Sequence, residues 1–264
     1  MIQPFLNVAL VQSNLSWMDV DSNLNHIESI VMSSLATNYK NQVEVDVWVL
    51  PEMFSTGFTM DVTGLDQKDT DVVISWMQSL AQSTNALITG SIAVKDHNGY
   101  WNRSYAVSAD GVLSMYDKVQ TFSLSGESDV YNHGDHTNVF TYKGWRIKPL
   151  ICYDLRFPRL SSNPDLYDVL IYVANWPNTR ITHWNKLLEA RSIENQAYVI
   201  GVNRVGTDPN GFLYNGNSAA YGPMGTLIVE AQSSVEQIVV SNLSYDNLIA
   251  IRKQLPFIYD TKQV

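Results

Sequence analysis

The sequence at residues 45–52 is VDVWVLPE, an apolar run that ends at a proline and is followed directly by an acid. A short run rich in β-branched and aromatic residues is typical of a buried strand. Pro51 ends the strand, because proline has no N–H to donate to a neighbouring strand. The strand therefore stops just before the charged side chain of Glu52, and a reactive residue follows a strand twice more along the chain.

Segments with strand and helix periodicity alternate on both sides of this run. Before it, apolar residues recur at the three- or four-residue spacing that one face of a helix requires, at Leu24, Ile27, Val31 and Leu35. Further helices are predicted over residues 69–82 and 183–196. The apolar side chains of the latter, at Trp184, Leu187, Leu188 and Ile193, are expected to point mostly inward. Other strands are predicted at residues 5–11, 86–94, 101–108, 112–116, 145–152, 169–174, 198–202, 226–230 and 236–240.

Turn sequences indicate how part of the sheet is paired. Residues 96–99 (DHNG) and 109–111 (ADG) are typical of hairpin turns, so the three strands between residues 86 and 116 should pair in order. Residues 121–136 have no periodicity, which predicts a long irregular loop, and such loops are often functional. Because no linker or repeat divides the chain, we expect a single mixed α/β domain over residues 1–264, with helices covering its sheets.

Composition argues against several classes of protein. Of the 264 residues, 45% are hydrophobic and 16% are charged, which suits a large folded core and not a disordered chain. The formal charge of -9 disfavours nucleic acid and anionic membranes as partners. No apolar run reaches the roughly 18 residues of a membrane-spanning helix, and the N-terminus lacks a signal-peptide pattern. We expect a cytoplasmic protein, in which the glycosylation sequons at Asn102 and Asn242 have no role.

Three potentially reactive residues each lie at the end of a predicted strand. Glu52 and Lys118 follow their strands, and Cys152, the only cysteine, is the last residue of its strand. Because sites in α/β sheets form at the carboxyl ends of strands, we expect these three side chains to meet. A single cysteine also excludes an intramolecular disulfide and a two-cysteine metal site.

Together the three residues could attack a carbonyl group. A thiol is a weak nucleophile at its ordinary pKa, so Cys152 needs a base or a cation beside it. Glu52 could take the thiol proton, and Lys118 could stabilise the thiolate and the oxyanion that develops on the carbonyl oxygen. The backbone N–H of Tyr153 could donate a further hydrogen bond to that oxyanion.

Each of these residues also has an ordinary structural interpretation. Cys152 could be a small buried apolar residue. Glu52 could cap a helix, and Lys118 could be a solvated surface lysine.

Histidines offer two alternatives to the carboxylate-based site. A Cys–His pair is common in thiol enzymes, and only His133 and His136 lie in a loop that could reach Cys152. The same two histidines with Asp135 could also suggest a metal site. The sequence supplies no third secure ligand, so we expect no metal.

Longer motifs around the reactive residues resemble the nitrilase superfamily, also called the carbon–nitrogen hydrolases. The motifs that carry the resemblance are LPEMFSTGF at 50–58, YDK at 116–118, ICYDLRFP at 151–158, ANWP at 174–177 and NRVG at 203–206. They occur in the family's order, and the similarity is nearly continuous from residue 8 to about residue 225. The stretches FSTGF at 54–58 and LPF at 255–257 are most similar to the omega-amidase branch, which hydrolyses the terminal amides of 2-oxoglutaramate and 2-oxosuccinamate.

The resemblance implies a role for each reactive residue. Glu52 would be the general base, Lys118 its electrostatic partner and Cys152 the nucleophile that forms a thioester, with no cofactor. Glu127 matches a second glutamate that the family uses to position the lysine or the substrate. Without the family, Glu127 is only an acid in a polar loop.

The resemblance also implies a fold and an assembly. The expected architecture is a four-layer α-β-β-α sandwich, with two subunits packing their helical layers together as a homodimer. Within the ICYDLRFP motif we expect Asp154 and Arg156 to form a structural pair under the turn that carries the nucleophile, and not to act in catalysis.

The implied substrate is a small amide with a carboxylate at its far end, which requires a cation in the pocket. Arg180 is the candidate for this cation, with Phe54, Phe122 and Trp176 as apolar walls. Each aromatic residue could instead belong to the ordinary core, and Arg180 could be a surface residue.

Two other functions stay open at this point. One is a different activity of the superfamily, such as hydrolysis of aliphatic amides, N-carbamoyl compounds or nitriles. The other is a non-catalytic binding protein on the same fold, against which the presence of all three reactive residues argues.

Overall fold

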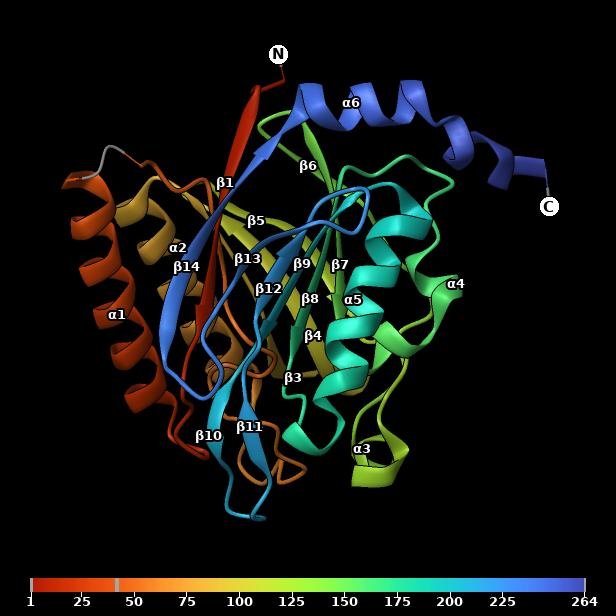
Figure 1. Cartoon of the computed structure of the whole chain (residues 1–264). Coiled ribbons are helices and arrows are strands. Elements are labelled where there is room, and N and C mark those ends of the chain that lie inside the picture. The colour runs from red at the N-terminus through yellow and green to blue at the C-terminus, as the bar shows by residue number, and fades with distance from the viewer. Residues whose placement is uncertain (1, 41–42, 264) are drawn as a thin grey trace.

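The structure is a computed structural model that describes residues 2–40 and 43–263. Over these residues it contains two six-stranded sheets, packed face to face between layers of helices (Figure 1). Helices α1 (Val20–Lys40) and α2 (Gln67–Thr84) cover the outer face of the first sheet, and α5 (Ile181–Asn195) covers the second. This arrangement is the four-layer α-β-β-α sandwich, as predicted.

The first sheet has the strand order β14-β1-β2-β3-β4-β5. Its strands are β1 (Phe5–Gln12), β2 (Val47–Val49), β3 (Leu87–Asp96), β4 (Gly99–Ser108), β5 (Gly111–Asp117) and β14 (Gln237–Ser244). Strands β1, β2 and β3 run parallel, whereas β3, β4 and β5 form consecutive antiparallel hairpins. The two predicted hairpin turns are confirmed, since Asp96 pairs with Gly99 and Ser108 pairs with Gly111.

The second sheet has the order β13-β12-β9-β8-β7-β6, with β7, β8 and β9 parallel. Its strands are β6 (Phe140–Tyr142), β7 (Trp145–Ile151), β8 (Val169–Ala174), β9 (Tyr198–Asn203), β12 (Ala219–Tyr221) and β13 (Leu227–Glu230). A separate ribbon of β10 (Val205–Thr207) and β11 (Leu213–Asn215) lies at the lower end of the molecule in Figure 1, as does α3 (Glu127–Val130). The chain termini lie at the opposite end.

Alternating side chains along the strands divide the apolar residues between two cores. On β1, Leu6, Val8 and Leu10 belong to the core between the sheets, whereas Ala9 and Val11 belong to the core under α1 and α2. This is the period of two expected of a strand buried on both faces. The packed inter-sheet core fixes the distance between the strand ends that carry the reactive residues.

The helical predictions are confirmed with one exception. The inward-facing residues Ile27 and Val31 of α1 are fully buried, and so are Trp184 and Leu188 of α5. The prediction that Ile193 faces inward is wrong, because its side chain is 50% exposed. Five residues after Leu188, Ile193 lies about 140° around the helix from the buried face.

Several short elements were not predicted from the sequence. Strands β6, β10, β11 and β12 have three residues each, too few for alternation to be recognised. Helix α6 (Tyr245–Gln254) was also missed, and the loop at 121–136 contains α3. Within residues 2–40 and 43–263, none of the helices has the length and apolar character needed to cross a bilayer.

Candidate active site

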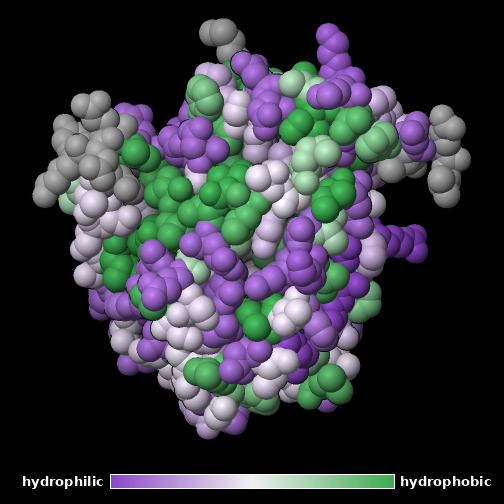
Figure 2. Space-filling view, viewed as in Figure 1, coloured by the Kyte–Doolittle hydropathy of each residue, from purple (hydrophilic) through white to green (hydrophobic). Residues whose placement is uncertain are grey.

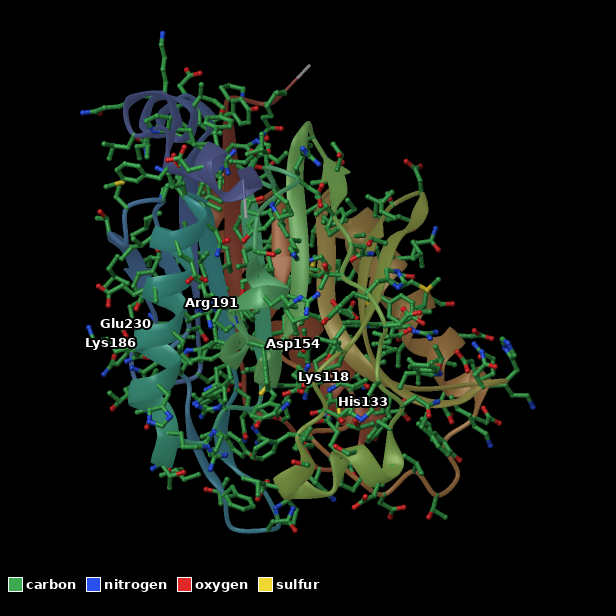
Figure 3. The ribbon with its side chains drawn as sticks, turned by 90° about the vertical axis from the view of Figure 1, so that its right-hand side faces the viewer. Lys118, His133, Asp154, Lys186, Arg191 and Glu230 are labelled. Atoms are coloured by element: carbon green, nitrogen blue, oxygen red, sulfur yellow. The ribbon has the colours of Figure 1, made fainter. Side chains whose placement is uncertain are left out.

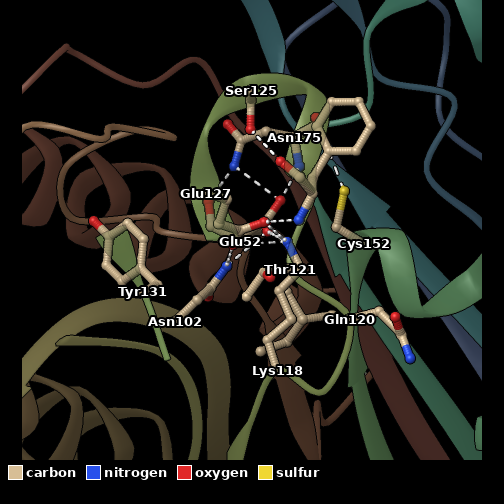
Figure 4. A network of polar contacts seen from close by, with 12 residues as sticks. Glu52, Asn102, Lys118, Gln120, Thr121, Ser125, Glu127, Tyr131, Cys152 and Asn175 are labelled. Atoms are coloured by element: carbon tan, nitrogen blue, oxygen red, sulfur yellow. Dashed lines mark hydrogen bonds and ion pairs between the residues drawn. The ribbon is translucent and has the colours of Figure 1, made fainter. Parts of the chain in front are cut away.

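The ends of four strands from both sheets meet beside a pocket of about 560 Å³, which Cys152 and Asn175 line and against which Glu52 and Lys118 are buried. Glu52 follows β2 and Lys118 follows β5 in the first sheet, while Cys152 follows β7 and Asn175 follows β8 in the second. Figure 4 shows these side chains gathered into one network of polar contacts. The structure therefore brings together the three residues that the sequence placed at strand ends.

Cys152 sits on a sharp turn between strand and helix. It is the first residue of a 3₁₀ helix (Cys152–Arg156) and has a φ of 44°, a left-handed conformation that is uncommon for residues other than glycine. Such strain is typical of functional sites, where the surrounding structure holds it in place. Cys152 is partly exposed and lines the pocket, and its Sγ lies 4.0 Å from the main-chain oxygen of Asn175.

Two glutamates hold the ammonium group of Lys118. Its Nζ lies 2.8 Å from Oε1 of Glu52 and 2.9 and 2.8 Å from Oε1 and Oε2 of Glu127. The side chains of all three residues are fully buried. Lys118 is therefore not a solvated surface lysine, and Glu127 is not merely an acid in a polar loop.

The carboxylate of Glu52 receives hydrogen bonds on both of its oxygens. Oε1 accepts from Nδ2 of Asn102 at 2.8 Å as well as from Lys118. Oε2 accepts from the main-chain N–H of Asn175 at 2.8 Å, and Nδ2 of Asn175 also donates to the main-chain oxygen of Glu52 at 2.6 Å. Glu52 lies outside the helices of the structure and caps none of them.

Burial and charge act in different directions on the lysine and the cysteine. Burial alone would lower the pKa of Lys118, but Glu127 and Glu52 outweigh it and raise the pKa. Burial raises the pKa of the Cys152 thiol, and Glu52 adds to this effect, while Lys118 opposes it. At neutral pH the lysine is therefore a cation and the cysteine is a thiol, which must lose its proton to a base before it can attack.

Asp154 supports the turn of the nucleophile from below. Its Oδ2 accepts from the N–H of Ile151 at 2.9 Å and from the hydroxyl of Tyr116 at 2.8 Å, while Oδ1 accepts from the N–H of Gln120 at 2.9 Å. Burial raises the pKa of Asp154 to about 6, despite the lowering effect of these hydrogen bonds. Figure 3 shows Asp154 and Lys118 at the same end of the sheets.

The pocket walls include most of the residues that the sequence assigned to them. Phe122, Trp176 and Arg180 line the pocket, and the guanidinium of Arg180 lies 5.4 Å from the centre of the Phe122 ring. Phe54 does not line it. Its side chain is fully buried in the core under α2, with its ring 5.9 Å from that of Trp76, so its assignment as a wall is wrong.

Phe58 lines the pocket from the same segment, four residues after Phe54. Its ring centre lies 5.3 Å from Nζ of Lys118, beside the reacting groups. Between the strand and these residues the chain turns at Met53, which has a φ of 45°, and the buried Phe54 follows directly.

Arg156 was expected to pair with Asp154, and this expectation is also wrong. The guanidinium lies 4.7 Å from the centre of the Trp176 ring, and Nη2 contacts Nδ1 of His183 at 3.2 Å. Arg156 lines the pocket, and burial lowers its pKa, with a further lowering by the nearby charge of Arg180. Within the described part of the chain, neither arginine forms an ion pair with an acid.

The loop histidines do not join this cluster. His133 contacts the hydroxyl of Thr121, and His136 contacts its neighbour Asp135. Among residues 2–40 and 43–263, no three His, Cys, Asp or Glu side chains lie close enough together to hold a metal ion.

Two asparagines of the site were not assigned a role from the sequence. Asn175 follows a predicted strand directly, so the rule that selected Glu52 and Cys152 could have found it. Asn102 lies within β4, and no sequence signal connects it with the site.

Comparison with known proteins places this geometry in a family. The carbon–nitrogen hydrolase family matches residues 7–253. The chain is 41% identical to the omega-amidase YafV of Yersinia enterocolitica, covering 97% of this chain and 96% of the relative. It is 28% identical to the 2-oxoglutaramate amidase of Bacillus subtilis, covering 97% of both chains.

A solved structure agrees with these similarities. The carbon–nitrogen hydrolase superfamily protein XC1258 of Xanthomonas campestris superposes with a TM-score of 0.90 at 34% identity, over 98% of this chain and 97% of that one. The match covers both sheets and the helices that enclose the Glu52, Lys118 and Cys152 cluster. The chain therefore belongs to the carbon–nitrogen hydrolase family, the nitrilase superfamily, in its omega-amidase branch, and it is an amidase.

Proposed function

We propose that this amidase hydrolyses the terminal amide of a short 2-oxo dicarboxylic acid monoamide, such as 2-oxoglutaramate or 2-oxosuccinamate, through a thioester on Cys152. One observation carries the proposal. The pocket places a thiol beside the buried Glu52–Lys118 pair, with two unpaired arginines on its wall. The names of the relatives, omega-amidase and 2-oxoglutaramate amidase, support the same substrate class.

In the first half of the reaction, Sγ of Cys152 attacks the amide carbon while its proton passes to Glu52. The negative charge that develops on the substrate oxygen is stabilised by the field of Lys118 and by the N–H of Tyr153. The carbon–nitrogen bond then breaks, the departing nitrogen takes the proton from Glu52, and ammonia leaves. The acyl group remains on sulfur as a thioester.

The second half uses the same groups on water. Glu52 accepts a proton from a water molecule as its oxygen attacks the thioester carbon. The carbon–sulfur bond breaks, the proton returns to sulfur, and the carboxylic acid product leaves. A single carboxylate serves as base and acid in turn, which requires that it stay fixed relative to Sγ in both halves.

The three protons of the Lys118 ammonium are all directed at Glu52 and Glu127. The lysine therefore acts on the oxyanion through its charge, while the N–H of Tyr153 supplies the directed hydrogen bond. The two groups act differently because an ammonium group has three N–H donors, and the two glutamates accept from all three.

The far end of the substrate is proposed to bind at Arg180 and Arg156. Each guanidinium is stacked against an aromatic ring, on Phe122 and Trp176 respectively, and each faces the pocket. Two cations held near each other without an acid are stabilised when an anion binds between them. A carboxylate matches the planar donor groups of arginine in geometry and charge.

Replacing Arg180 with alanine is expected to raise the KM for 2-oxoglutaramate and glutaramate by about 10- to 100-fold, because a charged hydrogen bond to the carboxylate is lost. The KM for an uncharged amide such as butyramide should stay within about twofold. Initial rates of ammonia release at varied substrate concentration measure both. Arg159→Ala is the matched control, since Arg159 is exposed and lies outside the pocket. An equal rise for charged and uncharged amides would remove Arg180 from the proposed carboxylate site.

A substrate panel tests the proposed function itself. It compares 2-oxoglutaramate, glutaramate, glutamine, an N-carbamoyl amino acid, a simple aliphatic amide and a nitrile by ammonia release. We expect the highest kcat/KM for 2-oxoglutaramate, and mass spectrometry of a quenched reaction should show its acyl group on Cys152. Preference for another compound class would move the protein to a different superfamily activity, and no turnover of any compound would favour a binding protein.

We also propose that the protein is a homodimer that associates through the side of α5 and α6. Exposed apolar side chains on and near these helices include Ile193, Met224, Ile249 and Phe257. Figure 2 shows further apolar surface where β13 and β14 lie. Leu227 and Ile228 of β13 are among the exposed apolar residues. Exposed apolar groups that cluster in this way are typical of protein contacts.

Sedimentation equilibrium is expected to give about twice the chain mass of 29.7 kDa at micromolar concentration. Ile193→Glu should shift the protein towards the monomer, because it places a charge on the proposed contact. Val112→Glu is the control, since Val112 is also exposed but lies on β5. A monomer at every concentration would exclude the dimer.

A further inference from the structure

One buried asparagine contacts every charged residue of the catalytic cluster. Asn102, on β4, is 1% exposed. Its Nδ2 donates to Oε1 of Glu52 at 2.8 Å and to Oε1 of Glu127 at 3.0 Å, and its main-chain oxygen accepts from the N–H of Lys118 at 3.0 Å. Because Asn102 is buried, its side chain cannot be glycosylated in the folded protein. Its amide group instead donates hydrogen bonds to the two glutamates.

The orientation of the Asn102 amide is set by its neighbours. Both protons on Nδ2 point to carboxylates, while the buried Oδ1 has no hydrogen-bond partner among the described residues. Turning the amide over would place Oδ1 against Glu52 and Glu127, whose oxygens are acceptors only. An unpaired buried oxygen is itself unfavourable, so the two donated bonds must outweigh it.

The charges of the cluster explain why a neutral donor is useful there. Glu52 and Glu127 carry two negative charges, and Lys118 carries one positive charge, so the buried cluster has one excess negative charge if both acids are ionised. Hydrogen bonds donated to a carboxylate favour its charged form. Asn102 supplies one such bond to each acid without adding a charge of its own.

The contacts on Glu52 also determine which of its oxygens can take a proton. Oε1 already accepts from Lys118 and Asn102. Oε2 accepts one short bond, from the N–H of Asn175 at 2.8 Å, and a longer contact of 3.4 Å from Nδ2 of the same residue. A contact of 3.4 Å is long for a hydrogen bond, so Oε2 is the less occupied oxygen and the one better able to take the proton of Cys152.

We propose that Asn102 is a positioning residue that holds the Glu52 carboxylate turned so that Oε2 is presented to Cys152. With Lys118 it occupies Oε1, and through Glu127 it holds the lysine in the same place. Asn102 is not among the residues that line the pocket, and it acts on the reaction through the base. This inference rests on the proposed function, because it requires Glu52 to be the general base.

The test uses Asn102→Ala and Asn102→Asp in the full chain, with kcat, KM and the pH profile of kcat/KM measured on the best amide of the panel. Asn102→Ala is expected to lower kcat by about 10- to 100-fold with little change in KM, since a hydrogen bond to a charged group is lost. The acid limb of the profile should move to higher pH by about 1 unit, which corresponds to one such interaction. Asn102→Asp, which keeps the shape but adds a third acid, should shift the limb further.

Two controls separate positioning from a merely structural role. Asn163 is also buried and donates through Nδ2 to two main-chain oxygens, so Asn163→Ala should lower the melting temperature without moving the acid limb. In a Glu52→Gln background, adding Asn102→Ala should change the residual rate by less than about threefold, because residues that act as a unit are not additive.

The possible outcomes are distinguishable. An acid limb that stays in place in both Asn102 variants, or an additive loss in the Glu52→Gln background, would overturn the positioning role while leaving the amidase function intact. If Asn102→Ala does not fold, the isosteric Asn102→Asp provides the pH profile. Failure of the wild type to hydrolyse any amide of the panel would instead reject the proposed function.

Discussion

Replacing Cys152 with alanine is expected to lower ammonia release from the preferred amide by about 10⁴- to 10⁶-fold, the loss typical of removing a catalytic nucleophile. The reason is that Cys152 supplies the only thiol of the chain, and it lines the pocket beside the Glu52–Lys118 pair. Initial rates under saturating substrate measure the loss. Intact-mass spectrometry should show an acyl adduct on the wild type and none on the variant.

The Cys152→Ala variant should keep the fold. Removing one sulfur from a partly exposed position leaves the hydrogen bonds of Asp154 to the same turn in place. Its melting temperature should therefore stay within a few degrees of the wild type. Ammonia release at the wild-type rate by a folded Cys152→Ala variant would exclude the thioester mechanism.

Replacing Lys118 with methionine is expected to reduce both stability and activity. Methionine matches the length of the lysine stem, but Glu52 and Glu127 would then be buried without their shared cation. Removing one partner of a buried ion pair typically costs about 3–5 kcal/mol. The loss of charge stabilisation should lower kcat by at least about 10²-fold. Urea unfolding and initial rates measure the two effects separately.

A second substitution separates the two roles of Lys118. In Lys118→Met/Glu127→Gln, one of the two stranded carboxylates is neutralised, so part of the lost free energy of unfolding should return. Activity should not return, because the oxyanion still lacks its cation. Recovery of kcat together with stability would show that Lys118 only holds the fold.

The position of the reactive residues could be predicted because it depends on backbone rules. Glu52 follows a strand that Pro51 ends, and Cys152 follows a strand in the other sheet. Strands whose apolar residues alternate or run continuously must pack in a few ways, and their carboxyl ends form the sites of α/β folds. A mixed α/β domain with helices covering its sheets and the meeting of Glu52 with Lys118 both follow from such general constraints, whereas the four-layer sandwich came from the resemblance to the nitrilase superfamily.

The direction of side chains in the turns could not be predicted. Phe54 and Phe58 are four residues apart in a segment without periodicity, and the chain turns at the left-handed residue Met53 directly before Phe54 enters the core. In the 3₁₀ turn, Asp154 points under the nucleophile while Arg156 points into the pocket. Neither the composition nor the spacing of these stretches contains that information, because it depends on single dihedral angles.

Asn102 illustrates a different limit. Its motif signals glycosylation, yet the residue is enclosed by two acids and a lysine that are 25, 50 and 16 residues away along the chain. The periodicity of the sequence indicates which face of β4 is buried. It does not indicate which polar groups from other segments lie next to Asn102.

The hydrogen bonds of Asp154 join the two halves of the molecule. The acid belongs to the turn after β7, and its donors Tyr116 and Gln120 belong to β5 and the segment that follows it. The nucleophile therefore cannot shift relative to the lysine segment unless one sheet slides over the other. Heat or pressure that loosens the contact between the sheets should abolish turnover before secondary structure is lost. The rate of turnover would then be a measure of how tightly the two sheets are packed.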